Sequence, residues 1–294
     1  MKYLVATAAL LLAAYFWYPP ARLAILVATG NSPVCPLSSA LRSRSNLDET
    51  GAIKDRIYAA SRLIREDSGL ELWETPKGQF WIPRGNRFVL PYNLAEMERH
   101  VYGERIRSGD IVLDCGASDG DFTREALRAG AGKVISIEVA PSTIECLRRN
   151  LAPEIAAGRV VVYPKGVWDR DDVLTLEVDD TNFAANSVVM HTGSMHPSVQ
   201  VPLTSIDHIV AELALPRVDF IKMDVEGAEA NAIAGARETL TKFKPRMAIA
   251  AEHKPDDEIE LPKVVRAIRP DYRLQCGQCL EAKGHIRADV LFFD

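Results

Sequence analysis

The sequence predicts a doubly wound α/β fold built around a mostly parallel sheet of seven core strands. An apolar run over residues 111–115 ends in a glycine-containing turn and passes into a helical pattern, as the first strand and helix of such sheets do. A second apolar run, over residues 219–224, also passes into a helix. From Asp110 onward, apolar runs and amphipathic stretches alternate, and this alternation is typical of parallel sheets.

Each expected element of the sheet follows from this alternation. The seven core strands are expected at residues 111–115, 134–138, 160–163, 220–224, 247–252, 272–275 and 290–293. The helices between them are expected at residues 122–128, 143–150, 228–240 and 258–268. Two further strands are expected as an insertion after the third core strand, at residues 173–178 and 199–203. The last two core strands are expected to pair like a hairpin.

The chain divides into four expected segments. A membrane anchor or signal segment, a linker, a helix-and-hairpin extension and the main domain are assigned to residues 1–30, 31–47, 48–109 and 110–294. Within the extension, a helix, a hairpin and a second helix are expected at residues 48–67, 72–82 and 93–102. Asn93 is the expected N-cap of the second helix, with Glu96 three residues later as its capping-box partner.

The N-terminal segment begins with an apolar run, residues 3–18, that ends in a cluster of aromatic side chains. The run is a little short of the roughly 20 residues that span a bilayer, but terminal aromatic residues are typical of a membrane interface. Basic residues are more frequent after the run than before it. The positive-inside rule therefore predicts a membrane-anchored protein whose main domain faces the cytoplasm. The alternative is cleavage of the run as a signal peptide, followed by secretion.

The composition excludes one broad class of partner. The 294 residues are 47% hydrophobic and 26% charged, with a formal net charge of −5. A chain of this length can bury one large core. Its scattered basic residues argue against a nucleic-acid-binding protein, which should present a basic face. No pattern in the sequence predicts an oligomeric state.

Five cysteines cannot all pair within one chain. Cys115 and Cys146 fall on an expected strand and an expected helix, where free thiols pack as small apolar residues. Cys276 and Cys279 form a C-x-x-C motif, which in other settings is a redox pair or half of a zinc site. No second such pair supplies four ligands, and the motif lies in a turn instead of at a helix N-terminus. A purely structural role is therefore favoured.

The turn after the first strand has the composition of a ligand-binding loop. Asp114 ends the strand, and Gly116 and Gly120 follow it; glycines allow the backbone to approach a ligand closely. Ser118 stands where a dinucleotide fingerprint has its middle glycine, so a pyrophosphate would fit poorly. The second strand ends in Glu138, where such folds bind a pair of ribose hydroxyls. This pattern suits S-adenosylmethionine, which has a ribose and an amino-acid tail but no phosphate.

Together with a second motif, this turn closely resembles the FkbM family of S-adenosylmethionine-dependent methyltransferases. The second motif is Asp-Phe-Ile-Lys-Met-Asp-Val-Glu-Gly-Ala-Glu, residues 219–229. The resemblance extends over about residues 70–294, and Ser118 and Asp119 replace the asparagine and the small or apolar residue that the family shows more often. The resemblance implies the class I, Rossmann-like methyltransferase fold, S-adenosylmethionine as cofactor, and acceptors such as sugars or natural products.

In this class of fold, ligands bind beyond the carboxyl ends of the strands, where the strand order reverses. We therefore expect Asp114 to bind the ammonium group of the donor or to orient its loop, and Glu138 to accept both ribose hydroxyls. Gly166 and Val167 follow the third strand, where the adenine edge is usually held. Trp168 is the candidate stacking partner for the adenine ring, although a large aromatic residue more often packs in the core.

The candidate catalytic groups on the same rim are Asp224, Glu226 and His253. Neighbouring carboxylates raise one another's pKa, which suits a general base near neutral pH. Asp224 is placed first because it lies in the more specific motif, and His253 is the other candidate base. We predict no metal; the alternative is a divalent cation held by Asp224, Glu252 and His253.

The sequence thus predicts an O-methyltransferase that acts on a hydroxyl of a sugar, a glycolipid or a natural product. The expected partner is a small-molecule or glycan acceptor, with no nucleic acid and with a membrane contact through the N-terminal segment. Two alternatives stay open. One is a non-catalytic binding module with a methyltransferase-like sheet, and the other is methyl transfer to an amine nitrogen.

Overall fold

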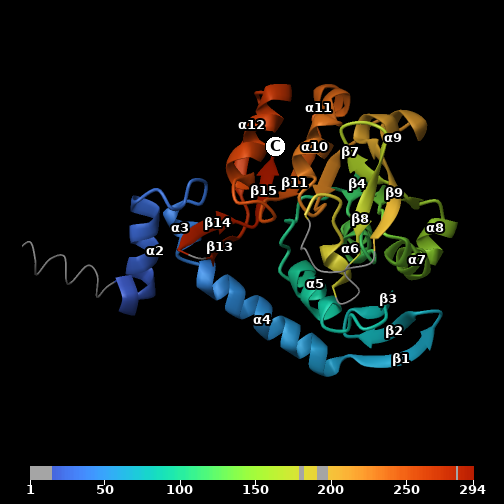
Figure 1. Cartoon of the computed structure of the whole chain (residues 1–294), viewed down its shortest axis with the longest axis horizontal. Helices are drawn as coiled ribbons and strands as arrows, with labels where there is room; N and C mark the ends of the chain where they lie inside the picture. Colours follow the sequence, from blue (N-terminus) through green and yellow to red (C-terminus); the bar gives the residue numbers. More distant parts are fainter. Residues whose placement is uncertain (1–14, 179–181, 191–197, 283) are drawn as a thin grey trace, which may run out of the picture.

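A computed structural model of the chain describes residues 15–178, 182–190, 198–282 and 284–294. Figure 1 shows an α/β body that contains the main sheet. The long helix α4 (Ser43–Ala60) runs beside this body and joins the N-terminal helices to a small sheet, β1 to β3, at the far end.

The central sheet has seven strands in the order β12-β15-β11-β10-β4-β5-β6. They are β4 (Ile111–Cys115), β5 (Lys133–Ile137), β6 (Val160–Tyr163), β10 (Phe220–Met223), β11 (Arg246–Ala250), β12 (Leu274–Cys276) and β15 (Val290–Phe293). The neighbours from β11 to β6 are parallel, and β15 is antiparallel to both β11 and β12. The predicted mostly parallel sheet of seven strands is confirmed, as is the pairing of its last two strands.

The strand order reverses at β4, which lies between β5 and β10. All four residues of β10 are buried, as expected for a central strand of a parallel sheet that is covered on both faces. The carboxyl ends of β4, β5 and β10 therefore lie together at the place where folds of this kind bind ligands.

The helices of the domain include one that is divided against expectation. They are α6 (Asp121–Arg128), α7 (Pro141–Asn150), α8 (Ala152–Ala156), α9 (Ile206–Glu212), α10 (Glu229–Ala234), α11 (Arg237–Phe243) and α12 (Asp257–Ile268). The single helix predicted over 228–240 is wrong, because Gly235 separates α10 from α11. A Cβ atom on Gly235 would lie 2.1 Å from the carbonyl oxygen of Trp168. This close approach requires a glycine, and glycine weakens a helix.

The insertion after β6 forms a second sheet, in the order β7-β9-β8. Its strands are β7 (Gly166–Trp168), β8 (Asp172–Glu177) and β9 (Ser198–Ser205), and the short 3₁₀ helix η1 (Phe183–Ala185) follows β8. The two predicted inserted strands are confirmed as β8 and β9. The sequence analysis did not predict β7, which at three residues is too short to show an alternating pattern.

The extension differs from its prediction at both helices. It contains α4, β1 (Arg62–Asp67), β2 (Leu70–Thr75), β3 (Gly78–Pro83) and α5 (Val89–Glu98). The predicted hairpin is confirmed as β2 and β3. The helix predicted over 48–67 instead ends at Ala60, and the following residues form β1, an edge strand that pairs with β2 and is exposed at every position. Asn93 lies inside α5 and does not cap it, because α5 begins four residues earlier.

The residues predicted as a linker are largely structured. They include α3 (Leu37–Ala40) and the start of α4, and Cys35 and Ala40 are buried. The preceding helix α2 (Pro19–Ala28) buries Leu23 and Leu26 in the main apolar core. That core also contains Ile286 and Ala288 of β14 (His285–Ala288), which pairs with β13 (Cys279–Ala282). The buried apolar residues of α2, which lie within the predicted N-terminal segment, thus pack against the protein's own domain.

The membrane anchor or signal segment was predicted over residues 1–30, and residues 1–14, which hold most of its first apolar run, lie outside the described part of the chain. Within the described part, no helix combines the length and the apolar character needed to cross a membrane. The orientation toward the cytoplasm stays a prediction.

A disulfide joins Cys35 to Cys279 across a sequence separation of 244 residues. This disulfide was not predicted, because Cys35 is too distant in sequence from Cys279 to be inferred from spacing. It is compatible with the structural role expected for the C-x-x-C motif. Cys276 is a free thiol that donates a hydrogen bond to the carbonyl oxygen of Val34. Cys115 and Cys146 are free and buried, as predicted.

This disulfide is expected to stabilise the fold by limiting the unfolded chain. Cys35→Ser should lower the free energy of unfolding by about 2–4 kcal/mol. Thermal melting with and without reductant measures the effect, and Cys276→Ser is the matched control because it changes the neighbouring thiol that is not cross-linked. Equal melting temperatures for the two variants under oxidising conditions would show that the cross-link contributes no stability.

Candidate active site

A cavity of about 500 Å³ opens at the carboxyl ends of β4, β5 and β10. Its lining comes from the turn after β4, from the residues that follow β5, β6 and β10, from α5 and from the segment around η1. Of the residues predicted from the sequence, those that line the cavity are Gly116, Glu138, Gly166, Val167, Asp224 and Glu226.

Gly116 lines the cavity at the point where β4 and β10 approach each other. Its φ is +78°, and a Cβ atom there would lie 1.8 Å from the carbonyl oxygen of Asp224. Gly120 has a different role. It has a φ of +91° at the start of α6, where a Cβ atom would lie within 3 Å of the side chains of Leu147 and Leu151. Gly120 therefore permits helix packing and is not among the cavity-lining residues.

Asp114 is fully buried behind the turn and is not among the cavity-lining residues. Its Oδ2 accepts a hydrogen bond from the Thr123 hydroxyl at 2.6 Å, and its Oδ1 lies 3.6 Å from Nζ of Lys222. Burial raises the pKa of Asp114, although Lys222 and Thr123 oppose the shift. Because Lys222 also donates to the Gly116 carbonyl oxygen at 2.7 Å, this pair orients the turn. Of the two roles predicted for Asp114, the geometry favours the indirect one.

Glu138 lines the cavity with a carboxylate that the backbone holds in place. It accepts hydrogen bonds from the backbone N–H groups of Ser118, Val139 and Ala140, at 2.9, 2.7 and 2.8 Å. Burial raises the pKa of Glu138, against the lowering effect of these backbone bonds. A carboxylate has about four acceptor positions, so one remains for a ligand hydroxyl. Glu138 can therefore accept a hydrogen bond from one ribose hydroxyl more readily than from the two that were expected.

Trp168 lies outside the cavity lining, in contrast to its neighbours Gly166 and Val167. Successive side chains of a strand point to opposite faces. Val167 faces the cavity, and Trp168 packs against the apolar cluster formed by Leu176, Val201 and Leu203 of the second sheet. The stacking role predicted for Trp168 does not match this position.

Asp119 is an unusual feature of the same turn. It is fully buried, and neither of its carboxylate oxygens has a hydrogen-bond partner among the described residues. Burial, reinforced by the nearby Asp121, raises the pKa of Asp119 well above its usual value. A carboxyl group whose pKa is higher in the folded than in the unfolded protein stabilises the fold most at low pH, below its unfolded-state pKa of about 3.9. This stabilisation is lost as the pH rises through the pKa of the folded state.

We therefore expect Asp119→Ala to stabilise the protein at pH 8. Removing a buried group without partners should raise the free energy of unfolding by about 1–3 kcal/mol, and the gain should shrink toward pH 4. Thermal melting of wild type and variant at both pH values measures it, with the exposed Asp48→Ala as control. A gain that is absent, or that does not depend on pH, would contradict this account.

Asp224 stands at the centre of a network of charges on the cavity wall. Its Oδ2 accepts a hydrogen bond from the Tyr102 hydroxyl at 2.6 Å and lies 3.8 Å from Nζ of Lys222. Burial alone would raise the pKa of Asp224, but Lys222, His253 and the Tyr102 hydrogen bond together lower it. The prediction that neighbouring carboxylates raise this pKa is wrong, because the sequence does not reveal that two cations lie closer.

Glu226 also lines the cavity, from a strained backbone position. Its φ is +51°, a conformation that L-residues rarely adopt and that is often found at functional sites. The hydroxyl of Ser187 donates to its carbonyl oxygen at 2.7 Å and helps to hold the turn. Burial raises the pKa of Glu226 in spite of the neighbouring His253, so this carboxyl, and not Asp224, has the raised pKa that was expected of the general base.

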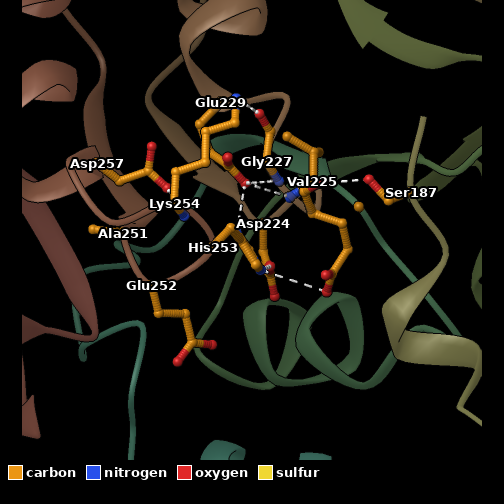
Figure 2. A network of polar contacts seen from close by, with 12 residues as sticks. Ser187, Asp224, Val225, Gly227, Glu229, Ala251, Glu252, His253, Lys254 and Asp257 are labelled. Atoms are coloured by element: carbon orange, nitrogen blue, oxygen red, sulfur yellow. Dashed lines mark hydrogen bonds and ion pairs between the residues drawn. The ribbon is translucent and has the colours of Figure 1, made fainter. Parts of the chain in front are cut away.

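His253 lies behind this wall, and only 8% of its side chain is exposed. Nε2 is 3.5 Å from Asp224 and from Glu226, and Nδ1 is 3.1 Å from Glu229 (Figure 2). Burial would lower the pKa of His253, but the three carboxylates outweigh it and raise the pKa to about 12. An imidazole that is already protonated cannot accept a proton, so the geometry does not favour His253 as the general base.

Several cavity residues were not singled out from the sequence as site residues. Tyr102 contacts Asp224 directly, and Phe88, Tyr92 and Glu96 of the α5 region form one wall. Glu96 was interpreted as a capping partner because its local pattern gives no sign of the cavity. These residues belong to the extension, which lies about 120 residues before β10 in sequence, and only the tertiary fold brings them to the site.

The order of the sheet and the position of its cavity define the fold of a class I methyltransferase. The chain belongs to the FkbM methyltransferase family, because the model of the methyltransferase FkbM domain matches residues 114–280. The protein is accordingly a methyltransferase, and folds of this class generally use S-adenosylmethionine.

Three named proteins are similar to parts of this chain. The 2-O-methyltransferase NoeI of Sinorhizobium fredii (strain NBRC 101917 / NGR234) is 23% identical over 169 residues, which are 52% of this chain and 68% of NoeI. The crystal structure of methyltransferase FkbM from Methylobacillus flagellatus KT has a TM-score of 0.47 and 20% identity, and the match covers 85% of this chain but only 59% of that one. The precorrin-6y C5,15-methyltransferase of Geobacter metallireducens GS-15 has a TM-score of 0.40 and 13% identity, covering 68% and 86% of the two chains.

Proposed function

We propose that this protein is an O-methyltransferase that transfers a methyl group from S-adenosylmethionine to a hydroxyl of a sugar, glycolipid or natural product. The observation that carries the proposal is one cavity lined by two chemically distinct sets of residues, Glu138 with Ser118 and Asp224 with Glu226. We assign the first set to the cofactor end of the cavity and the second set to the acceptor end. The similarity to a protein named 2-O-methyltransferase supports transfer to oxygen.

The first end of the cavity fits the cofactor. The hydroxyl oxygen of Ser118 is buried and has no hydrogen-bond partner among the described residues, and such a group requires a ligand or a water. Glu138 keeps an acceptor position for a ribose hydroxyl, and Gly166 and Val167 offer a flat surface for the adenine. When bound there, S-adenosylmethionine supplies a methyl group that is attached to a sulfonium sulfur, and this sulfur is a good leaving group.

The residues at the second end align the acceptor and remove its proton. Asp224 is held by Tyr102 and Lys222, so its carboxylate has a fixed position from which to accept a hydrogen bond from the acceptor hydroxyl. Glu226, with its raised pKa, is the carboxylate better matched to take up the proton near neutral pH. Most of the rate enhancement is expected from this alignment and from the proton transfer.

The wall formed by α5 supports a polyhydroxylated acceptor. Tyr92, Asn93 and Glu96 line the cavity from neighbouring positions on this helix, and Phe88 lies just before it. Phe88 and Tyr92 are exposed, so they form an apolar surface at the cavity mouth. Aromatic faces next to carboxylate and amide groups are suited to a sugar ring, which presents both C–H faces and hydroxyls.

The cofactor assignment predicts that Glu138→Gln weakens binding of S-adenosylhomocysteine 10- to 100-fold. Loss of a charge-assisted hydrogen bond costs about 1.5–3 kcal/mol. Glutamine is preferred to alanine because it keeps an acceptor for the backbone N–H groups that hold Glu138. Isothermal titration measures the affinity, with Glu96→Gln at the acceptor end as control. Wild-type affinity in a folded Glu138→Gln variant would remove Glu138 from the cofactor site.

The reaction itself is tested by mass spectrometry of products. Wild-type protein, S-adenosylmethionine and a panel of sugars, glycolipids and amines should give an O-methylated product that is absent with Asp224→Asn. An N-methylated product would replace the proposal with the amine alternative. Cofactor binding without turnover on any acceptor would favour a non-catalytic module.

A further inference from the structure

The imidazole of His253 is fixed on one side and open on the other. Its Nδ1 lies 3.1 Å from Oε1 of Glu229. The same oxygen accepts the backbone N–H of Val225 at 2.9 Å, and Glu229 is 1% exposed. Figure 2 shows this arrangement, with Glu229 on one side of the His253 ring and Asp224 on the other. The ring orientation is therefore set by a buried carboxylate, and Nε2 is directed toward the cavity wall.

The open side of the ring faces two carboxylates at an unusual distance. Nε2 lies 3.5 Å from Oδ1 of Asp224 and 3.5 Å from Oε1 of Glu226. Charge-assisted hydrogen bonds are shorter, about 2.7–2.9 Å. A cation about 2.1 Å from each atom would separate them by 3.5 Å at a bond angle of about 113°, close to tetrahedral. The distances thus fit a shared cation better than a direct hydrogen bond.

The charges of the cluster also favour a bound cation. Three carboxylates, those of Asp224, Glu226 and Glu229, surround one imidazole. Lys222 lies near Asp224, with Nζ 3.8 Å from Oδ2. Oε2 of Glu229 is buried and has no hydrogen-bond partner among the described residues. Ligand atoms of Asp224, Glu229 and His253 all lie within 4.8 Å of one another. Such a cluster is short of positive charge on the side that opens to the cavity.

We propose that a divalent cation binds at the acceptor end of the cavity to the carboxylates of Asp224 and Glu226 and to Nε2 of His253, where it replaces the proton that Nε2 carries in the free protein. Glu229 acts as a positioning residue, because a metal-binding histidine usually donates its other N–H to a carboxylate. This set differs from the alternative suggested by the sequence. Glu252 points away from the cluster (Figure 2) and forms a hydrogen bond with Asp289 instead.

The role of the cation rests on the proposed function. A divalent cation beside an acceptor hydroxyl makes that hydroxyl more acidic and orients its oxygen. With the cation bound, Glu226 would be a ligand and not the base, and the proton of the acceptor would pass to solvent. The two carboxylates suit Mg²⁺ or Mn²⁺, whereas the imidazole and the near-tetrahedral angle suit Zn²⁺. Mn²⁺ is chosen as the probe because it is paramagnetic. Both carboxylates line the cavity, so a cation held between them would be accessible to the acceptor.

Binding of Mn²⁺ to the full chain tests the proposal without any activity measurement. After treatment with a chelator and its removal, electron paramagnetic resonance of free Mn²⁺ should show one bound ion per chain. We expect His253→Gln and Asp224→Asn to weaken binding at least 10-fold, and Glu229→Gln to weaken it 10- to 100-fold through loss of the positioning contact. Glu252→Gln is the matched control, and it should bind Mn²⁺ as the wild type does.

Two outcomes would overturn the proposal. One is the absence of Mn²⁺ binding to wild type at millimolar concentration. The other is binding that survives both His253→Gln and Asp224→Asn in variants whose circular dichroism shows a folded protein. Titration with S-adenosylhomocysteine in the presence of chelator separates this inference from the proposed function. Cofactor binding and full turnover without any cation would leave the methyltransferase assignment intact and remove only the metal site.

Discussion

Gly116→Ala is expected to abolish cofactor binding, with a loss of affinity of more than 100-fold. A Cβ atom at this position would lie 1.8 Å from the carbonyl oxygen of Asp224. That oxygen belongs to the backbone, so no side-chain rotation can relieve the clash. The turn and the end of β10 would have to separate. Because the Gly116 carbonyl oxygen is also bonded to Lys222, the separation would displace the charge network that runs from Asp114 to Asp224.

The measurement is isothermal titration with S-adenosylhomocysteine, together with thermal melting. Gly158→Ala is the matched control, since Gly158 also has a positive φ, +69°, but nothing within 4 Å of its Cβ position. That control should lose only the roughly 1–2 kcal/mol that the left-handed conformation costs. If Gly116→Ala is no worse than Gly158→Ala in stability and in binding, the close approach of Gly116 to Asp224 is not required for cofactor binding.

The core of the fold could be predicted because its strands are buried and short. In β4 and β10 nearly every residue is apolar and buried, so a continuous apolar run identifies them. β1 lacks this signal because all six of its residues are exposed, and its spacing was mistaken for the continuation of a helix. The break between α10 and α11 depends on contact with β7, which a local pattern cannot contain.

Site residues could be predicted where a single sequence motif contains them, but not where the tertiary fold brings distant residues together. Asp224 and Glu226 follow β10 directly, and Glu138 follows β5, so their places at the strand ends were evident from the sequence. Tyr102 comes from the extension, and its contact with Asp224 spans 122 residues. The environment of His253 depends on three carboxylates that surround the ring, and the sequence alone suggested a free base there.

Asp224→Asn is expected to reduce kcat by on the order of 100-fold or more, while affinity for S-adenosylhomocysteine changes little. Asparagine keeps the size of the side chain and an oxygen that can accept the Tyr102 hydrogen bond. It removes the negative charge beside Lys222 and His253. The acceptor hydroxyl then loses a fixed anionic partner, whether Asp224 takes up the proton itself or holds a cation that makes the hydroxyl more acidic.

Three experiments distinguish the possible roles of the Asp224 carboxylate. Asp224 has a lowered pKa and stays ionised through the neutral range, whereas Glu226 has a raised pKa. If Glu226 takes up the proton, kcat of wild type rises with pH through the raised pKa of Glu226, and Glu226→Gln removes that rise.

Rescue of Asp224→Asn by excess Mn²⁺ would identify a lost ligand. If His253→Ala alone abolishes turnover while Asp224→Asn retains it, the base is His253, and the pKa that its three carboxylates impose in the free protein must fall when the acceptor binds. Full activity in all three variants would mean that the acidic wall does not act on the acceptor, and the catalytic group would then have to be sought among the residues of α5.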